Sequence, residues 1–285
     1  MPTSLQDNGF LSDEAASINA EIKTNYKQLF FYLTETNEQA HKYLAKLKVA
    51  SQDLKELLTG ALLGRALTAY QALMLLAGRG FASEVRGTCR SLLEVKFLLG
   101  YLAEESSAAN LMLAKHEEER VKRLKKMKSG ELPVHRDLAN RDWDTLIAQA
   151  QARRRDLLGT EGKLLSIRRM AEKGGFLTDY LGPYAFLSNA THSGVRELEG
   201  YLEFDTEKKA ATRFRYGPND GPWIPWCTLI ATGYLRDCVE ITAVIFGIHK
   251  ERWSDSWFKV RCKRHDEILD RYRDQLSADF EAGKS

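Results

Sequence analysis

The sequence predicts an all-α protein, a multi-helix bundle built around one central buried helix. Apolar residues recur with helical spacing along most of the chain, and the 285 residues include only six prolines. From Leu92 to Leu102 the apolar side chains point in every direction around a helix, which is typical of a helix buried on all sides. No shift in composition divides the chain, so we expect a single helical domain over residues 1–285.

The first half of the chain should contain four helices. Asp13 and Glu14 open a segment whose apolar positions continue at helical spacing to Phe30. The helices expected after it are Asn37–Val49, Gln52–Ala77 with Ser51 as its cap, and the central helix from about Phe81 to Glu105. We expect the N-terminal helices of residues 10–50 to pack on the core.

The second half begins with a strongly charged helix after Ser106 or Ser107, which we interpret as an exposed arm. A loop at 130–142, two helices at 143–158 and 163–173, and a helix restarted by Gly182–Pro183 with Pro183 in its first turn should follow. The stretch 201–216 alternates polar and apolar residues in part and fits either a short β-hairpin or a loop. Helices at 224–246 and 254–281 complete the chain, and the second of them should pack on the core.

Charge, cysteine content and hydropathy bear on possible partners and on the cellular location of the protein. The 42 basic residues nearly balance 39 acidic ones, so the net charge of +3 does not by itself indicate nucleic-acid binding. The basic run Arg120–Lys128 and the triplet Arg153–Arg155 could contact phosphates, but a solvated helix face is the favoured interpretation. Four widely spaced cysteines, no recognisable targeting signal and charges that interrupt 223–248 predict a soluble cytoplasmic protein without a membrane span.

Metal and cofactor chemistry have no support in the sequence. His116–Glu117 resembles the start of a zincin helix, but the required second histidine is replaced by Arg120. The chain has no paired Cys-x-x-Cys, no Walker loop and no glycine-rich dinucleotide motif. We therefore expect no metal and no cofactor.

One candidate cluster comes from the central helix, where Arg86, Arg90 and Glu94 follow one another at intervals of four residues. Glu94 stands inside the apolar run, and a buried carboxylate must be paired, hydrogen-bonded or protonated. The cluster is either a structural ion pair, which we favour, or a site in which Glu94 acts as acid, base or ligand.

A second polar stripe has the same spacing and is the natural partner for Glu94. It consists of Tyr184, Ser188 and His192, with Arg196 one turn further. The Ser188–His192 pair lacks an orienting third residue, so a serine hydrolase is disfavoured. The candidate catalytic residues are thus Glu94, His192 and Ser188, and the candidate binding residues are Arg86, Arg90, Tyr184 and Arg196. We expect Glu94, His192 and Arg90 to share one buried cluster.

The run Arg90-Ser-Leu-Leu-Glu94 and the later Tyr184-x-x-Leu-Ser188-x-x-x-His192 resemble the bacterial domain-of-unknown-function family 5677 over about residues 58–248. The family commonly has His-Pro where this chain has His192–Ser193. The resemblance implies an all-helical fold and shared polar positions, without an established activity. A weaker similarity is to HEPN-type helical ribonucleases, although the arginine that should precede the histidine is missing and Arg196 follows it instead.

Two functions therefore stay open. The first is a non-catalytic interaction or effector module, linked by analogy with other small helical bacterial proteins to defence or mobile elements. The second is a metal-independent ribonuclease that uses His192 with Arg90 or Arg196. RNA or another protein are the partners we consider, and the sequence leaves open whether the chain forms homo-oligomers.

Overall fold

The structure is a computed structural model that describes residues 3–48, 52–133, 141–159, 166–191, 201–205, 210–214, 217–218, 221, 223–248, 267 and 270. The elements in chain order are α1 (Leu5–Asn8), a 3₁₀ turn (Gly9–Leu11), α2 (Asp13–Asn25), α3 (Lys27–Leu44), α4 (Leu54–Ala77), α5 (Ala82–Glu104), α6 (Ala108–Lys128), α7 (Trp143–Leu158), α8 (Ile167–Lys173), α9 (Leu177–Asp179), a π-helical segment (Tyr180–Tyr184), α10 (Ala185–Thr191), β1 (Leu202–Asp205), β2 (Ala210–Phe214) and α12 (Trp223–Ile245).

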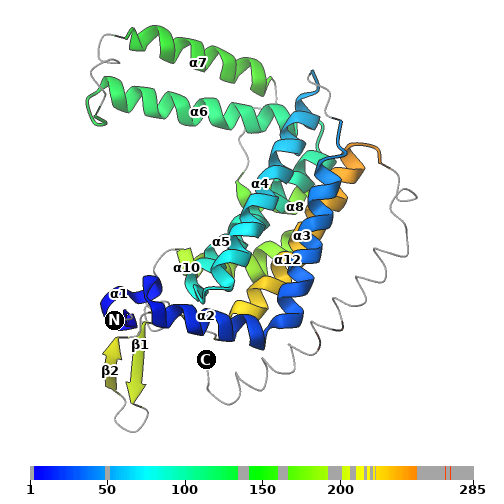
Figure 1. The fold of residues 1–285 in the computed structure, drawn as a ribbon. Helices are drawn as coiled ribbons and strands as arrows, with labels where there is room; N and C mark the ends of the chain where they lie inside the picture. Colours follow the sequence, from blue (N-terminus) through cyan, green and yellow to red (C-terminus); the bar gives the residue numbers. More distant parts are fainter. Residues whose placement is uncertain are drawn as a thin grey trace.

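The all-α prediction is confirmed, and α5 is the central helix (Figure 1). It packs against α4, α12, α8 and α10, while α3 packs against α4 and α12. Phe97 and Tyr101 of α5 are fully buried, as are its leucines Leu92, Leu93 and Leu99. Tyr70 of α4 and Thr232 of α12 hydrogen-bond across the core at 2.9 Å between their hydroxyl oxygens. The core therefore lies where α4, α5 and α12 meet.

The helix boundaries near the N-terminus differ from two predictions. A new helix at Asn37 was wrong: α3 runs from Lys27 to Leu44 without a break, and the chain bends at Tyr26 instead. Buried Leu33 and Ala40 flank Asn37 on one continuous face of α3, so packing favours an unbroken helix. The predicted helix start at Gln52 with Ser51 as its cap was also wrong: α4 begins at Leu54, and its cap is Asp53, whose carboxylate accepts a hydrogen bond from the Glu56 amide at 3.0 Å.

The expected helix start at Pro183 was also wrong. Pro183 lies inside the π-helical segment Tyr180–Tyr184, which connects α9 directly to α10. Proline has no amide hydrogen to donate to the preceding turn, so the backbone widens locally rather than starting a new helix. This wide turn directly follows Asp179 and ends on Tyr184, and both residues contribute to the site described below.

α5 and the end of α8 approach closely because a glycine lies on each side of the contact, Gly100 in α5 and Gly174 directly after α8. A Cβ on Gly100 would lie 2.4 Å from a ring carbon of Phe176 and 3.1 Å from the carbonyl oxygen of Gly174. A Cβ on Gly174 would lie 3.0 Å from the backbone of Gly100. The contact fixes the chain that leads into α9 against the central helix.

The predicted arm is a hairpin of α6 and α7 that projects from one end of the bundle (Figure 1). The two helices pack mainly on each other. Their contact surface is a small separate core of Val121, Ile147 and Ala150, with Leu124 packed against it. The arm thus has its own hydrophobic contacts in addition to those at its base.

The uncertainty at 201–216 is decided in favour of a hairpin, because β1 and β2 pair antiparallel with Leu202 opposite Phe214. The predicted helix at 254–281 falls almost wholly outside the described residues.

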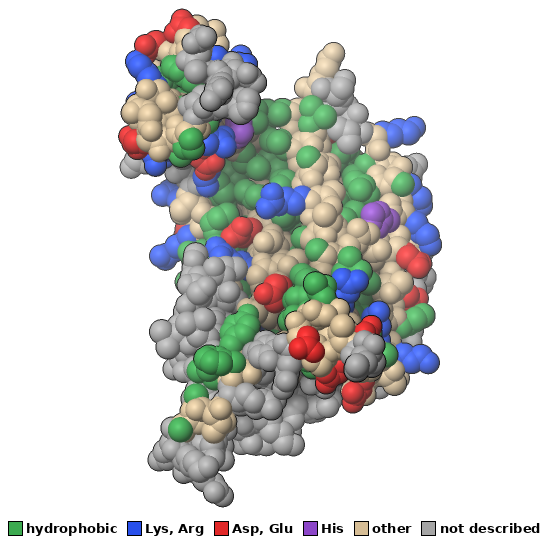
Figure 2. All heavy atoms as spheres, turned by 60° about the vertical axis from the view of Figure 1, so that its left-hand side comes forward, with side chains coloured by type: hydrophobic (Ala, Val, Ile, Leu, Met, Phe, Trp, Pro, Cys, Tyr) green, Lys and Arg blue, Asp and Glu red, His purple; other side chains and the backbone are tan. Residues whose placement is uncertain are grey.

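α4 is long and apolar enough to cross a membrane by length and composition alone. It packs here against α3, α5 and α12, and core helices of soluble proteins pass the same test. Its outer side exposes Leu57 and Leu75. Figure 2 shows apolar side chains gathered on the bundle surface below the projecting arm, which itself carries charged side chains of both signs.

Candidate functional site

Three of the predicted site residues form a closed polar triangle between α5 and the π-helical segment. Arg90 and Glu94, one turn apart on α5, form an ion pair of 3.2 Å. The Arg90 guanidinium donates to the Tyr184 hydroxyl at 3.0 Å, and this hydroxyl donates to Oε1 of Glu94 at 2.9 Å. The guanidinium carbon of Arg90 also lies 5.0 Å from the centre of the Tyr184 ring. We call this group the Tyr184 triangle.

The expectation that Glu94 is sealed from water was wrong. Its side chain is 31% exposed and that of Arg90 is 19% exposed, so the ion pair lies at the edge of the core. Tyr184 is buried. Burial and the neighbouring Glu94 raise the pKa of the Tyr184 phenol, with Arg90 acting in the opposite direction. The phenol is therefore neutral at physiological pH and remains a hydrogen-bond donor to Glu94.

Of the other predicted residues, Ser188 and Arg86 are described by the structure, and His192 and Arg196 are not. Ser188 donates from Oγ to the carbonyl oxygen of Tyr184 at 2.7 Å, a local bond within the helical backbone. The guanidinium of Arg86 stacks over the Trp223 ring of α12, 5.2 Å from the ring centre. His192 and Arg196 lie outside the described residues, so the expected contact between Glu94 and His192 stays a prediction.

The residue that sequence reasoning missed is Lys96. It is the buried charge of α5, with only 4% of its surface exposed. Its Nζ lies 2.6 Å from Oδ2 of Asp179 at the end of α9 and 2.7 Å from Oδ2 of Asp237 on α12. The ammonium also sits over the rings of Phe176 and Tyr234, 4.3 and 5.1 Å from their centres. We call this group the Lys96 triad.

Two opposing effects act on the ammonium. Burial lowers the pKa of Lys96, but Asp237 and Asp179 raise it by more, so the net pKa lies above the usual lysine value. A lysine acts as a nucleophile only as the neutral amine, and this one is held protonated by two carboxylates. Lys96 therefore serves as a cation that joins α5, α9 and α12.

The signal for Lys96 was present in the sequence. Lys96 interrupts the apolar run of α5 as plainly as Glu94 does, and Asp237 interrupts the apolar residues of α12. Since lysine is almost never fully buried without a partner, both positions were candidates for a buried ion pair, although the sequence does not say which charges meet.

An aromatic group connects the two clusters. The buried Phe97 ring lies 6.3 Å from Tyr180 and 5.8 Å from Tyr184, centre to centre, and Tyr180 stacks on Tyr184 at 5.0 Å. Asp179 directly precedes the π-helical segment and Tyr184 ends it, so the two ends of this wide turn lie at the two clusters. Segments of this kind occur frequently at functional sites.

The thiols of the core offer no nucleophile. Cys89 and Cys238 are fully buried and free, and burial raises the pKa of each thiol above its usual value. Among the described residues, no group of three His, Cys, Asp or Glu side chains could hold a metal ion. The described chemistry is thus that of neutral phenol, protonated lysine and paired carboxylates.

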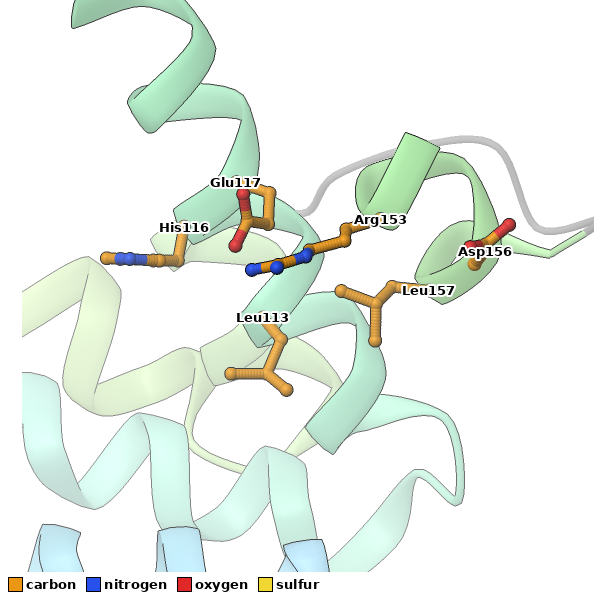
Figure 3. A pocket seen from close by; sticks show the side chains of 6 residues that line it. All are labelled: Leu113, His116, Glu117, Arg153, Asp156 and Leu157. Carbon is orange, nitrogen blue, oxygen red and sulfur yellow. The ribbon is translucent and has the colours of Figure 1, made fainter. Parts of the chain in front are cut away.

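Two pockets in the described part of the chain lie away from these clusters. One, of about 340 Å³, lies at the base of the arm between α6 and α7. Figure 3 shows Arg153 extending from α7 towards Glu117 and His116 of α6, above Leu113 and Leu157, while Asp156 points away. The other, of about 520 Å³, lies between the start of α4 and the start of α6.

Comparison with known proteins places part of the chain in a family. A family model described as a family of unknown function, DUF5677, matches residues 56–210. This range contains the Tyr184 triangle, Lys96, Asp179 and the whole arm, but not α12 with Asp237. No curated protein and no solved structure matches the chain.

Proposed function

We propose a function from the geometry of the clusters, because the chain belongs to DUF5677, a family whose function is unknown. The proposal is a non-catalytic helical interaction module, in which the Tyr184 triangle and the Lys96 triad fasten helices together. The surface available to a partner is the projecting arm of α6 and α7.

One observation carries the proposal: within each cluster, the polar side chains are bonded to other side chains of the same cluster. The Tyr184 hydroxyl accepts from Arg90 and donates to Glu94, which uses its donor and one acceptor position. The Lys96 ammonium is shared between two carboxylates. A catalytic acid or base needs a position from which it can reach a substrate proton, whereas the Tyr184 hydroxyl and the Lys96 ammonium are both bonded to protein partners.

The arm supplies the second element of the module. A two-helix hairpin with its own small core exposes far more surface than helices inside a bundle, and it does so at a defined geometry. We include in the proposal a cytoplasmic location, which the free, buried thiols of Cys89, Cys227 and Cys238 support, and a role in bacterial defence or mobile elements, which rests on analogy alone.

The test separates this module from a metal-independent ribonuclease. Purified protein is incubated in chelator with structured and unstructured RNA, beside His192→Ala and Tyr184→Phe variants. The module predicts no cleavage above that of the His192→Ala variant and a lowered melting temperature for Tyr184→Phe. Cleavage that His192→Ala abolishes in folded protein would overturn the proposal in favour of the nuclease.

A further inference from the structure

The arm of α6 and α7 has a large excess of basic over acidic residues. α6 and α7 together carry ten basic and five acidic residues, in a chain whose totals are nearly balanced. The imbalance is concentrated at the distal end, because α6 has no acidic residue from Arg120 to Lys128. The remainder of the chain is slightly acidic by difference.

Ion pairs within the arm use four of the cations. Arg120 pairs with Glu117, Lys128 with Asp144, and Glu118 receives both Lys122 and Arg154. The basic side chains of α6 and α7 that form no ion pair with the described residues are Lys115, Arg123, Lys125, Lys126, Arg153 and Arg155. All of these except the half-buried Lys115 are exposed.

Part of this arrangement opposes the folding of α6. Lys122 precedes Lys125 by three residues and Lys126 by four, and like charges at these spacings destabilise a helix by about 0.2–0.5 kcal/mol per pair. The helix dipole favours cations in the last turn, which accounts for Lys125 and Lys126 but not for Arg123 in the turn before it. An external anion would remove the repulsion.

The geometry of the arm fits an extended anion. α6 has 21 residues and is therefore about 30 Å long, and packing of Val121 against Ile147 and Ala150 holds it against α7. A nucleic-acid duplex presents one negative charge for roughly every 1.7 Å along its axis, so a rod of this length meets many phosphates.

We propose that the distal part of the arm binds the phosphodiester backbone of a nucleic acid through Arg123, Lys125 and Lys126. The proposal rests on the interaction-module function and names the partner of that module. Lysine and arginine without stacking aromatic side chains beside them provide contacts to phosphates rather than to bases, so the binding is independent of sequence.

The experiment measures binding of the full chain to labelled duplex DNA, duplex RNA and single-stranded RNA of equal length by fluorescence anisotropy, between 50 and 200 mM salt. The variant is Arg123→Gln/Lys125→Gln/Lys126→Gln. The matched control is Lys42→Gln/Lys46→Gln/Lys48→Gln, which removes the same charge from exposed lysines at the end of α3 and just after it.

We expect the wild type and the control to bind, with an affinity that falls steeply with salt. The arm variant should lower the slope of log K against log salt by about 2.7 for duplex DNA and about 2 for single strands. Its melting temperature should change little, because the loss of repulsion and the loss of favourable contact with the helix dipole oppose each other. The three nucleic acids identify which source of phosphate is preferred.

No binding at 50 mM salt, or equal slopes for the arm variant and the control, would overturn the inference. Binding to polyglutamate as tight as to a nucleic acid of equal charge would also overturn it and assign the arm to an acidic protein. Each reaction is also run on a gel: nucleic acid that is bound and then cut refutes the non-catalytic module while leaving the arm contact intact. Absence of binding refutes the arm contact alone.

Discussion

In the Lys96 triad, we predict that removing the two carboxylates destabilises the protein much more than removing the lysine. Replacing both Asp179 and Asp237 by Asn leaves an ammonium with 4% exposure and no counter-charge. Breaking a buried pair in this way costs about 3–5 kcal/mol. In Lys96→Met, by contrast, the side chain keeps its volume, and the two carboxylates left behind are 28% and 41% exposed and can be hydrated. We expect this change to cost less than about 1.5 kcal/mol.

Urea unfolding followed by far-UV circular dichroism measures both effects at pH 7. Adding Lys96→Met to the double Asn variant should recover most of the lost free energy, because no buried charge then remains. A Lys96→Met variant that loses as much stability as the double Asn variant would refute the view that burial of the cation, and not of the acids, sets the cost.

The Lys96 triad also predicts that removing its carboxylates reverses the way in which the stability contributed by Lys96 depends on pH. In the wild type the folded-state pKa of Lys96 is raised, so its stabilisation is complete below the unfolded value of about 10.4 and is lost as pH rises through the folded value. Without the carboxylates, burial alone remains and lowers that pKa. The double Asn variant should then gain stability as pH rises from its lowered pKa towards about 10.4, a region in which Lys96 contributes no pH dependence in the wild type.

Three further outcomes are expected. Tyr184→Phe should cost about 1–3 kcal/mol, because the hydroxyl serves both Arg90 and Glu94, whereas Tyr180→Phe, in the stacked ring beside it, should be nearly neutral in the same unfolding assay. Gly100→Ala should cost about 1–3 kcal/mol because its Cβ would meet Phe176, while Gly64→Ala, with open space around its Cβ on a helix, should gain about 0.5–1 kcal/mol. In hydrogen exchange the amides of α6 and α7 should open at a lower free energy than those of α5; equal protection would show that the arm is as strongly held as the bundle.

Local patterns predicted most of the helices. α7 has the bounds expected from the sequence, and α4, α5 and α12 begin and end within two residues of expectation. Apolar periodicity and capping residues depend on neighbours within one or two helical turns, so helix bounds can be predicted from them in a single sequence. The misplaced break at Asn37 and the π-helical segment around Pro183 arose where packing decided the backbone path.

The sequence by itself determined that α5 is a core helix, that it carries charges into the core, and that Arg90 and Glu94 lie on the same side of it. These properties depend on spacing along one helix. It also indicated Tyr184 as a partner for Glu94, a pairing that the structure confirms at 2.9 Å.

Only the tertiary structure decided which charge of α5 is buried. In a run that is apolar on every side, nothing local distinguishes the side that faces other helices from the side that faces water. α12 and α9 cover the side of Lys96 and bring Asp237 and Asp179 to its ammonium, while Glu94 lies at the edge and stays partly hydrated. Residues 83 apart in sequence, as Lys96 and Asp179 are, meet through the packing of separate helices, because periodicity fixes each helix but not its neighbours.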